Sequence, residues 1–512
     1  MARGSVRGIK SLAIAPFSAH PSKGDAGWRA REAASYNSPA ARERLEEGRS
    51  VTTSVQRVVR GLLGGVIGIA LLAPLAVEPA AAQSRPNLVR DAETEALIQD
   101  YLRPIYKAAG LRATSVELYL VNNPSFNAFV AAGDKIFVNT GAIIDSKTPN
   151  ELIGVLAHET GHLAGNHQIQ LRQQLETAKT MAMIGSVVGM GAAIAGAASG
   201  SGDAARAGGG IAMGSNELIR RGLLAYQRSE EMAADRLALT YLDKSGQSAK
   251  GMITTFQRFA DNTLFSSQGA NPYLQSHPMP NERIDLIENA AKKSKFYNTK
   301  DSPELQARHD MVRAKLSAFS EDSMLVMRRY PPSDTSMPAR YARAILAYRT
   351  GNSRAAIDQV GALIKSRPNF PYFYELQGQV LLESGRAKEA VAPLRKAVAA
   401  APKSGLLRIM LGQALVEVGD PKSVDEAVKN LTIGLQTDPD MPIGHRTLAR
   451  AYALRGDVAM ADLATAQGEF AEGRYKEAKS RARRVQKQFK EGSPAWLRAD
   501  DILSYTPPSK TN

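Results

Sequence analysis

The 512-residue sequence contains no cysteine, and this absence excludes several kinds of chemistry. Without thiols the chain forms no disulfide, binds no metal through thiolates and has no cysteine nucleophile. It also cannot carry a lipid on an N-terminal cysteine. Metal binding, if present, must therefore rest on other side chains.

Acidic residues are fewer than basic ones, 50 against 65, which gives a formal net charge of +15. A basic balance is one feature of nucleic-acid-binding proteins, but the chain lacks a recognisable nucleic-acid module and any stripe of mixed basic and aromatic residues. We therefore expect no nucleic-acid partner and interpret the charge as a solvated surface that tolerates anionic membranes or acidic clients. The length and a hydrophobic content of 44% leave room for two or three domains.

Residues 1–82 are predicted to be a leader. A basic flank precedes an apolar core at 61–77, and the small residues Ala80, Ala81 and Ala82 follow it. These are the parts of a signal peptide, which we expect to be cleaved after Ala82 and to direct export. An uncleaved membrane anchor is the alternative and would keep the same topology.

The stretch from His158 to His162 reads His-Glu-Thr-Gly-His, an H-E-x-x-H motif inside an apolar run. Two histidines four residues apart on a helix project from the same face, so both can bind one metal ion while Glu159 points to its open side. Imidazole and carboxylate ligands that leave one position for water are typical of a catalytic zinc site. We therefore predict one Zn²⁺ ion per chain.

The surrounding residues place this motif on a helix. Thr148 to Glu151 reads as a capping box with proline at the first helical position, and apolar residues then recur at helical spacing. His167 follows five residues after His162, where it has rotated off the ligand face. We interpret His167 as structural.

A further helix is predicted from Tyr226 through Leu242. Its Glu231 and Asp235 lie four residues apart on one face. One carboxylate can complete a zinc site, and a second carboxylate one turn away can hold a ligand histidine by its free ring N–H. Exposed acidic pairs on helices are common, so this pair alone is weak evidence.

A small sheet is predicted before the motif helix. Residues 91–111 have the pattern of an amphipathic helix, and residues 114–121 and 135–139 alternate like strands. Turn signals lie between the two strands, around residues 127–129. If the last strand is an edge, its free backbone groups could hold an extended peptide by strand addition.

Residues 177–199 form a second long run of Ala, Gly, Met, Ile and Val. The run is long enough to cross a bilayer, but it is rich in glycine and leads into further glycines. We therefore expect a mobile helical hairpin or lid, with possible membrane contact through 177–200, in preference to a true membrane span.

Four elements in this order resemble one family of enzymes. They are Asn127-Ala128-Phe129, His158-Glu159-x-x-His162, Glu231-x-x-x-Asp235 and Ser276-His277-Pro278 with Arg283. Over about residues 86–291 the chain resembles the gluzincin metallopeptidases that include the CAAX prenyl protease and HtpX. This resemblance implies an α+β metallopeptidase fold with a small sheet, and zinc-dependent hydrolysis of peptide bonds.

The resemblance also implies the roles of the matching residues. Those that would bind zinc are His158, His162 and Glu231. Glu159 would act as general base and later as general acid, and Asp235 would orient a ligand histidine. Residues Asn127, Ala128 and Phe129 would contact substrate.

His277 and Arg283 are implied to act in catalysis, and His277 has two possible roles. It could stabilise the tetrahedral oxyanion, or it could occupy the zinc as a fourth ligand in a resting, self-inhibited state. Chemistry permits either, because a neutral imidazole is a metal ligand and its N–H can polarise an oxyanion. If the cleft opens, His277 or Arg283 would help to hold the oxyanion.

The C-terminal part repeats with a period of 34 residues. Gly351, Gly385 and Gly419 keep this interval, Gly456 follows after a shift of three, and a small residue precedes each glycine by seven. This pattern is typical of tetratricopeptide repeats, in which paired helices touch at small residues and glycine lies in the turn. We predict four repeats and an atypical last helix at 476–490, stacked into an α-solenoid with a concave binding surface.

We therefore expect a mainly α protein with a leader at 1–82, a zinc metallopeptidase domain with a linker helix at 83–330 and a tetratricopeptide domain at 331–512. A signal-directed zincin joined to such repeats resembles periplasmic endopeptidases that act on misfolded or stalled polypeptides. Its clients would be outer-membrane barrel proteins, and the repeats would bind clients or the assembly machinery. The alternative is a repeat scaffold or chaperone whose metal site is vestigial.

Overall fold

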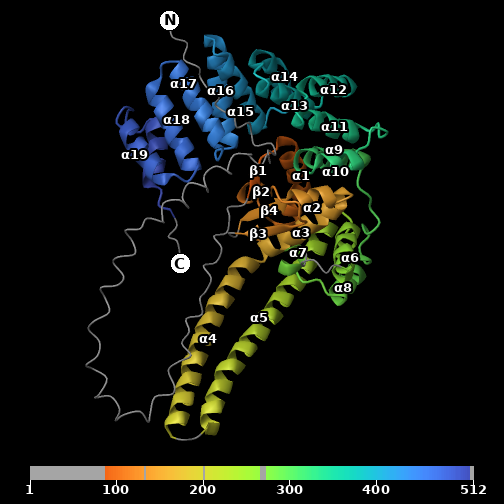
Figure 1. The fold of residues 1–512 in the computed structure, drawn as a ribbon, viewed down its shortest axis with the longest axis vertical. Helices are drawn as coiled ribbons and strands as arrows, with labels where there is room; N and C mark the ends of the chain where they lie inside the picture. Colours follow the sequence, from red (N-terminus) through yellow and green to blue (C-terminus); the bar gives the residue numbers. More distant parts are fainter. Residues whose placement is uncertain (1–86, 132–133, 200–201, 266–271, 508–512) are drawn as a thin grey trace, which may run out of the picture. The chain divides into compact units, whose positions relative to one another are not determined.

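The computed structural model describes residues 87–507, except 132–133, 200–201 and 266–271. The predicted leader and the cleavage after Ala82 lie outside the described residues. Within them the protein is mainly helical with one small sheet, followed by a long series of helix pairs (Figure 1). The predicted fold class is confirmed.

The sheet has four strands in the order β1-β2-β4-β3. These are β1 (Leu88–Val89), β2 (Glu117–Val121), β3 (Ala128–Ala131) and β4 (Lys135–Asn139). The central pair β2 and β4 is parallel, and β1 and β3 pair antiparallel with them. Sequence patterning found β2 and β4 but missed the two shorter strands, and it began β2 too early, where residues 113–115 form a 3₁₀ turn. The last strand, β4, is central, so the edge strand near the motif helix is β3.

Two helices with clear sequence signals form the core of the N-terminal part. Helix α1 (Ala92–Ala109) begins at Asp91, whose side chain accepts a hydrogen bond from the backbone of Thr94. Helix α3 (Pro149–Ala164) begins at Thr148, which caps the backbone N–H of Glu151 as predicted. Apolar side chains of α1, α3 and the inner strands share one core, including Leu97, Ile98, Ile105, Ile136, Val138, Leu152, Val155 and Leu156.

Every residue of α3 from Glu151 to Leu163 is buried. Burying a polar side chain costs free energy unless it finds partners. The buried histidines and glutamate of the H-E-x-x-H motif must therefore find polar or metal partners on neighbouring helices and loops.

Helices α4 (His167–Ala198) and α5 (Gly202–Lys244) run side by side and form a long hairpin (Figure 1). The expected hairpin thus exists, but it starts ten residues before Thr177 and absorbs the helix predicted from Tyr226. Among the described residues, α4 is the one helix long and apolar enough to cross a membrane, over His167–Ala195, and only 6% of its most apolar window is buried.

Shorter helices complete this part of the chain: α2 (Thr140–Asp145), α6 (Lys250–Phe265), α7 (Pro272–Ser276) and α8 (Asn281–Ala291). Helices α9 (Pro303–Ser320) and α10 (Ser323–Arg329) follow. Helix α9 connects two cores, because Val312 and Leu316 pack with the sheet while Met311 and Ala318 pack with the first repeat. Its two faces tie the N-terminal part to the repeats.

The repeats form four antiparallel helix pairs. They are α11 (Met337–Arg349) with α12 (Ser353–Ser366), α13 (Pro371–Glu383) with α14 (Ala387–Ala400), α15 (Gly405–Val418) with α16 (Pro421–Thr437) and α17 (Pro442–Leu454) with α18 (Val458–Ala471). The turn glycines Gly351, Gly385, Gly419 and Gly456 all have φ between 75° and 85°, a conformation that favours glycine. A fifth pair, α19 (Tyr475–Gln486) with α20 (Pro494–Ser504), replaces the single last helix that we expected.

A buried lysine lies where α9 meets α1 and α13. The ammonium group of Lys315 is 2.5 Å from Asp91, 3.5 Å from Glu93 and 3.0 Å from Glu375. Tyr341 of α11 donates a hydrogen bond to Glu93. Burial alone would lower the pKa of Lys315, but the surrounding carboxylates raise it well above its usual value. Burial raises the pKa of Glu93 to about 8, so this carboxyl is largely protonated at neutral pH, and one cation pairs with acidic groups from both parts of the chain.

We expect Lys315→Met to destabilise the protein by about 3–5 kcal/mol, because it leaves buried carboxylates without their cation. Urea denaturation of the full chain measures this change. The control is Lys292→Met, which removes an exposed lysine at the C-terminal end of α8 that pairs with Glu288 and should change little. Equal unfolding curves for Lys315→Met and the wild type would contradict the structural role of this cluster.

Candidate metal centre

The close approach of α3 and α5 brings the predicted residues together. A Cβ atom on Gly161 of α3 would lie 2.7 Å from the carbonyl oxygen of Ala234 in α5. Glycine at this position of the H-E-x-x-H motif therefore allows the two helices to touch. As a result, Glu231 of α5 faces the rings of His158 and His162.

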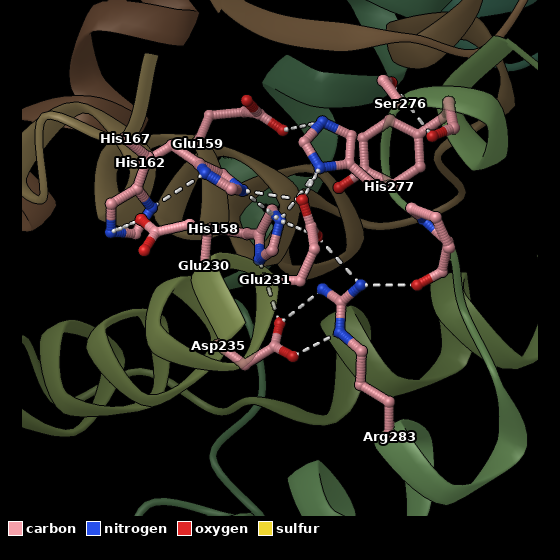
Figure 2. Close-up of polar contacts among 12 residues, drawn as sticks. His158, Glu159, His162, His167, Glu230, Glu231, Asp235, Ser276, His277 and Arg283 are labelled. Atoms are coloured by element: carbon pink, nitrogen blue, oxygen red, sulfur yellow. Dashed lines mark hydrogen bonds and ion pairs between the residues drawn. The ribbon is translucent and has the colours of Figure 1, made fainter. Parts of the chain in front are cut away.

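Four buried side chains point donor atoms at one place: His158, His162, Glu231 and His277 (Figure 2). The Nε2 atoms of His158 and His162 are 3.1 Å apart, and each lies 3.3 Å from an oxygen of Glu231. The Nδ1 atom of His277 is 2.8 Å from Glu231 and 3.5 Å from His158 Nε2.

These spacings are close to those of ligand atoms around a metal ion, although two of them, 3.1 and 2.8 Å, are shorter than the ideal. A tetrahedral ion with bonds of about 2.0–2.2 Å separates its ligand atoms by roughly 3.3–3.6 Å. The donor atoms of the cluster all lie within 4.8 Å of one another. The imidazoles of His158 and His162 and the carboxylate of Glu231 thus supply three ligand positions, and the imidazole of His277 supplies the fourth.

The electrostatics of the cluster also favour a cation. Burial opposes ionisation of Glu231, but contacts with His158, His162 and His277 lower its pKa far below the usual value. Burial lowers the pKa of His162 to about 3, so this ring is neutral and offers the lone pair that a metal needs. Burial also opposes a charge on His158, yet Asp235 and Glu231 raise its pKa to about 9. The same carboxylates would attract a metal ion.

Asp235 and Arg283 lie below the donor atoms in the view of Figure 2. Asp235 Oδ1 is 3.0 Å from Nδ1 of His158, the ring nitrogen that faces away from the cluster. The guanidinium of Arg283 donates to Asp235 at 2.8 Å and lies 2.9 Å from Glu231. A third contact goes to the backbone oxygen of Pro278. The guanidinium of Arg283 is therefore already paired with two carboxylates. These contacts favour a role in positioning Asp235 and Glu231 over a role in stabilising an oxyanion.

Glu159 lies beside the cluster and is buried. Burial raises its pKa above the usual carboxyl value, which suits a group that must both take up and release a proton near neutral pH. The Nε2 atom of His277 is 3.5 Å from Glu159, so this one imidazole faces Glu159 with one nitrogen and the donor cluster with the other. The ring of Tyr273 packs against His277 at a centroid distance of 4.7 Å. Sequence patterning gave no signal for Tyr273.

A cavity of about 640 Å³ opens beside the donor cluster. Its lining comes from α3, from the start of α4, from α5, and from β3 and α7 with the residues next to them. The lining residues are Asn127, Phe129, Val130, Ala131, His162, His167, Gln168, Leu171, Tyr226, Gln227, Glu230, Glu231, Pro272, Gln275, Ser276 and His277. Of the predicted substrate-contact residues, Asn127 and Phe129 line the cavity, whereas Ala128 is fully buried.

His167 is not one of the converging donors, but the reason differs from the one expected: α3 ends at Ala164, and His167 is the first residue of the next helix, α4. Its ring nonetheless contacts His162 and Glu230, and burial lowers its pKa. The sequence gave no reason to select Glu230, because its neighbour Glu231 alone matched the zinc pattern.

Comparisons with known proteins give two family matches. Residues 91–291 match peptidase family M48, and residues 341–405 match a tetratricopeptide repeat. A curated relative from Yersinia pestis, the beta-barrel assembly-enhancing protease, is 24% identical over 70% of this chain and 73% of its own length. The protease of the same name from Escherichia coli K12 is 22% identical over 76% and 77%. A solved structure, MamA MSR-1 C2, aligns with 34% of this chain and 99% of its own at 22% identity and a TM-score of 0.28.

We expect a metal ion to raise the thermal stability of the full chain, because the four donors converge only in the folded state. Zinc added to chelator-treated protein at 100 times its Kd should stabilise the fold by about 2.7 kcal/mol. His158→Ala should abolish this gain. A midpoint of unfolding that responds to zinc equally in His158→Ala and the wild type would show that the metal binds elsewhere.

Proposed function

We propose that this chain is a zinc-dependent endopeptidase of the cell envelope. The proposal starts from its being a metalloprotease, with a peptidase family M48 domain at residues 91–291 and tetratricopeptide repeats C-terminal to that domain. The observation that carries this proposal is the convergence of His158, His162 and Glu231 beside Glu159, at the wall of a cavity that an extended chain can enter. Two imidazoles and one carboxylate are the ligand set of many zinc peptidases.

In the proposed reaction His158, His162 and Glu231 would hold zinc. Zinc, when bound, polarises the scissile carbonyl and makes water easier to deprotonate. Glu159 takes the proton from the attacking water on its carboxylate and later delivers it to the departing amine. Asp235 keeps the ring of His158 oriented through Nδ1, and Arg283 holds Asp235 and Glu231 in place.

The edge strand β3 suits substrate alignment. Among the described strands β3 pairs only with β4, and its Phe129, Val130 and Ala131 line the cavity. An extended peptide can pair with the free side of such a strand through backbone hydrogen bonds, which are independent of side-chain identity. We propose that Asn127 and Phe129 contact the substrate there, a mode of binding that fits unfolded or stalled polypeptides.

His277 holds the fourth position of the donor cluster through Nδ1. We propose that this is a resting state, in which the imidazole blocks the place where water and substrate must enter. A bound client that draws α7 and His277 aside would open the site. In the closed state the repeats could still bind clients, so a chaperone activity without cleavage is the second candidate function.

The partners and location of the enzyme are proposed from its relatives and its surface. The relatives are named for β-barrel assembly, which supports outer-membrane proteins as clients and their assembly machinery as a partner of the repeats. We propose a periplasmic enzyme, exported by a leader that is cleaved after Ala82.

The hairpin supports membrane contact through residues 177–200. The side chains of Met181, Met183, Ile184, Val187, Val188, Met190 and Ile194 are all more than half exposed. Such an apolar surface can rest on a bilayer interface without spanning it.

Glu159→Gln should keep zinc and lose cleavage, because the amide is isosteric but cannot accept the proton of water. We expect the rate on an unfolded polypeptide to fall by roughly 10²–10⁴-fold, with bound zinc measured by atomic emission on the same sample. The exposed carboxylate Glu176 on α4 provides the control, Glu176→Gln. Full activity of Glu159→Gln would refute the assignment.

His277→Ala should increase proteolysis of an unfolded client, because it vacates the fourth position of the site. Turnover is measured against wild type and against Leu286→Ala, which alters an exposed residue of α8 outside the cavity. A lower rate would instead support His277 as the oxyanion stabiliser, and an unchanged rate would remove it from both roles. If zinc binds normally yet neither protein cleaves any client, the chaperone reading is favoured.

A further inference from the structure

His162 has a second ring nitrogen that the proposed mechanism does not use. Its Nε2 atom faces the donor cluster, and its Nδ1 atom lies 3.0 Å from Nδ1 of His167. On the far side of His167, Nε2 lies 2.9 Å from Glu230 Oε2. His162 and His167 are buried, and the Glu230 side chain is only 18% exposed.

Metal binding at His162 determines which ring nitrogens of His162 and His167 carry a hydrogen. If Nε2 of His162 gives its lone pair to zinc, the proton of that neutral ring is on Nδ1. Nδ1 of His162 then donates, and Nδ1 of His167 must accept. His167 consequently carries its own proton on Nε2, the atom that faces the carboxylate of Glu230. The 2.9 Å approach of His167 Nε2 to Glu230 Oε2 is compatible with this placement of the protons.

The backbone is shaped to hold the ring of His167. A Cβ atom on Gly165 would lie 2.1 Å from His167 Nε2 and 2.5 Å from Cδ2. Gly165 itself has φ of −77°, which alanine adopts without strain. Glycine at position 165 is therefore required because the His167 imidazole occupies the space of a Cβ atom. The backbone conformation of residue 165 does not itself require glycine.

We propose that His167 and Glu230 are positioning residues for the metal ligand His162. This inference rests on the proposed zinc site and adds to it. His167 fixes the tautomer and the tilt of the His162 ring, Glu230 fixes the tautomer of His167, and Gly165 provides the space that the His167 ring occupies.

The same arrangement is present at the other ligand ring. His158 has Asp235 at 3.0 Å from its outer nitrogen, and Arg283 holds Asp235 in turn. Each of the two imidazole ligands of α3 thus contacts a second side chain through its outer nitrogen, Asp235 for His158 and His167 for His162. A charged group, Arg283 or Glu230, contacts that second side chain in turn. Loss of such a partner typically lowers metal affinity by roughly 10–100-fold.

The test compares zinc affinity among variants by competition with a chromogenic chelator on the full chain. His167→Ala should weaken zinc binding by roughly 10–100-fold. His167→Asn should recover much of the loss, since its Oδ1 can accept where Nδ1 did. The visible spectrum of the cobalt-substituted protein should change in His167→Ala, because the ring of His162 is free to tilt.

Gly165→Ala gives a second test that leaves His167 in the sequence. The new methyl group displaces the ring, so zinc binding should weaken as in His167→Ala, while the fold should be as stable as before. Combining both substitutions should cost no more than His167→Ala alone, because the ring is already gone. His445→Ala, a similarly buried histidine in α17, is the control and should bind zinc like the wild type.

Wild-type affinity and an unchanged cobalt spectrum in both His167→Ala and Gly165→Ala would overturn the positioning role while leaving the zinc site intact. A wild-type protein that binds no zinc would instead overturn the proposed function, and this inference with it.

Discussion

The contact between α3 and α5 at Gly161 is the constraint on which the rest of the site depends. It brings a carboxylate from residue 231 to within 3.3 Å of two imidazoles more than sixty residues earlier in the chain. Neither helix contains a complete site by itself. The surrounding architecture serves to keep this contact: a core shared by α1, α3 and the sheet holds α3, and the ion pairs of Arg283 hold the acidic face of α5.

Buried charge is compensated in this protein at two separate places. In the candidate metal centre, the carboxylates of Glu231 and Asp235 contact imidazoles and the guanidinium of Arg283. A bound cation would compensate the remaining negative charge. At the junction of α1, α9 and α13, a single buried lysine pairs with acidic groups from both parts of the chain. Since unpaired buried charges are costly, both clusters also fix how their helices pack.

Sequence patterning predicted most of this architecture, for physical reasons that differ between elements. The H-E-x-x-H helix has a capping box and a periodic apolar face, and the repeats have glycines in turns of positive φ, so local rules suffice for both. The strands β1 and β3 were missed because runs of two and four residues are too short to show alternation. The long hairpin was underestimated because glycine lowers helix propensity, whereas packing of α4 along α5 overrides that preference.

The site could be predicted only in part. Residues of the motif and of the Glu231-Asp235 pair lie at helical spacing and can be recognised along the chain. The contacts of His167 with His162 and Glu230, and the packing of Tyr273 on His277, depend on how the segments meet in space. The contacts of Arg283 with Asp235 and Glu231 could not have been indicated by any spacing rule, and its expected help in holding the oxyanion stays a prediction.

The most direct measurement is anomalous diffraction at the zinc edge from crystals of the purified full-length chain. It should locate one ion about 2.0–2.2 Å from Nε2 of His158, Nε2 of His162 and a carboxylate oxygen of Glu231, with Nδ1 of His277 at the fourth position in the resting state. An anomalous peak elsewhere, or Glu231 standing well away from the two rings, would contradict the proposed centre.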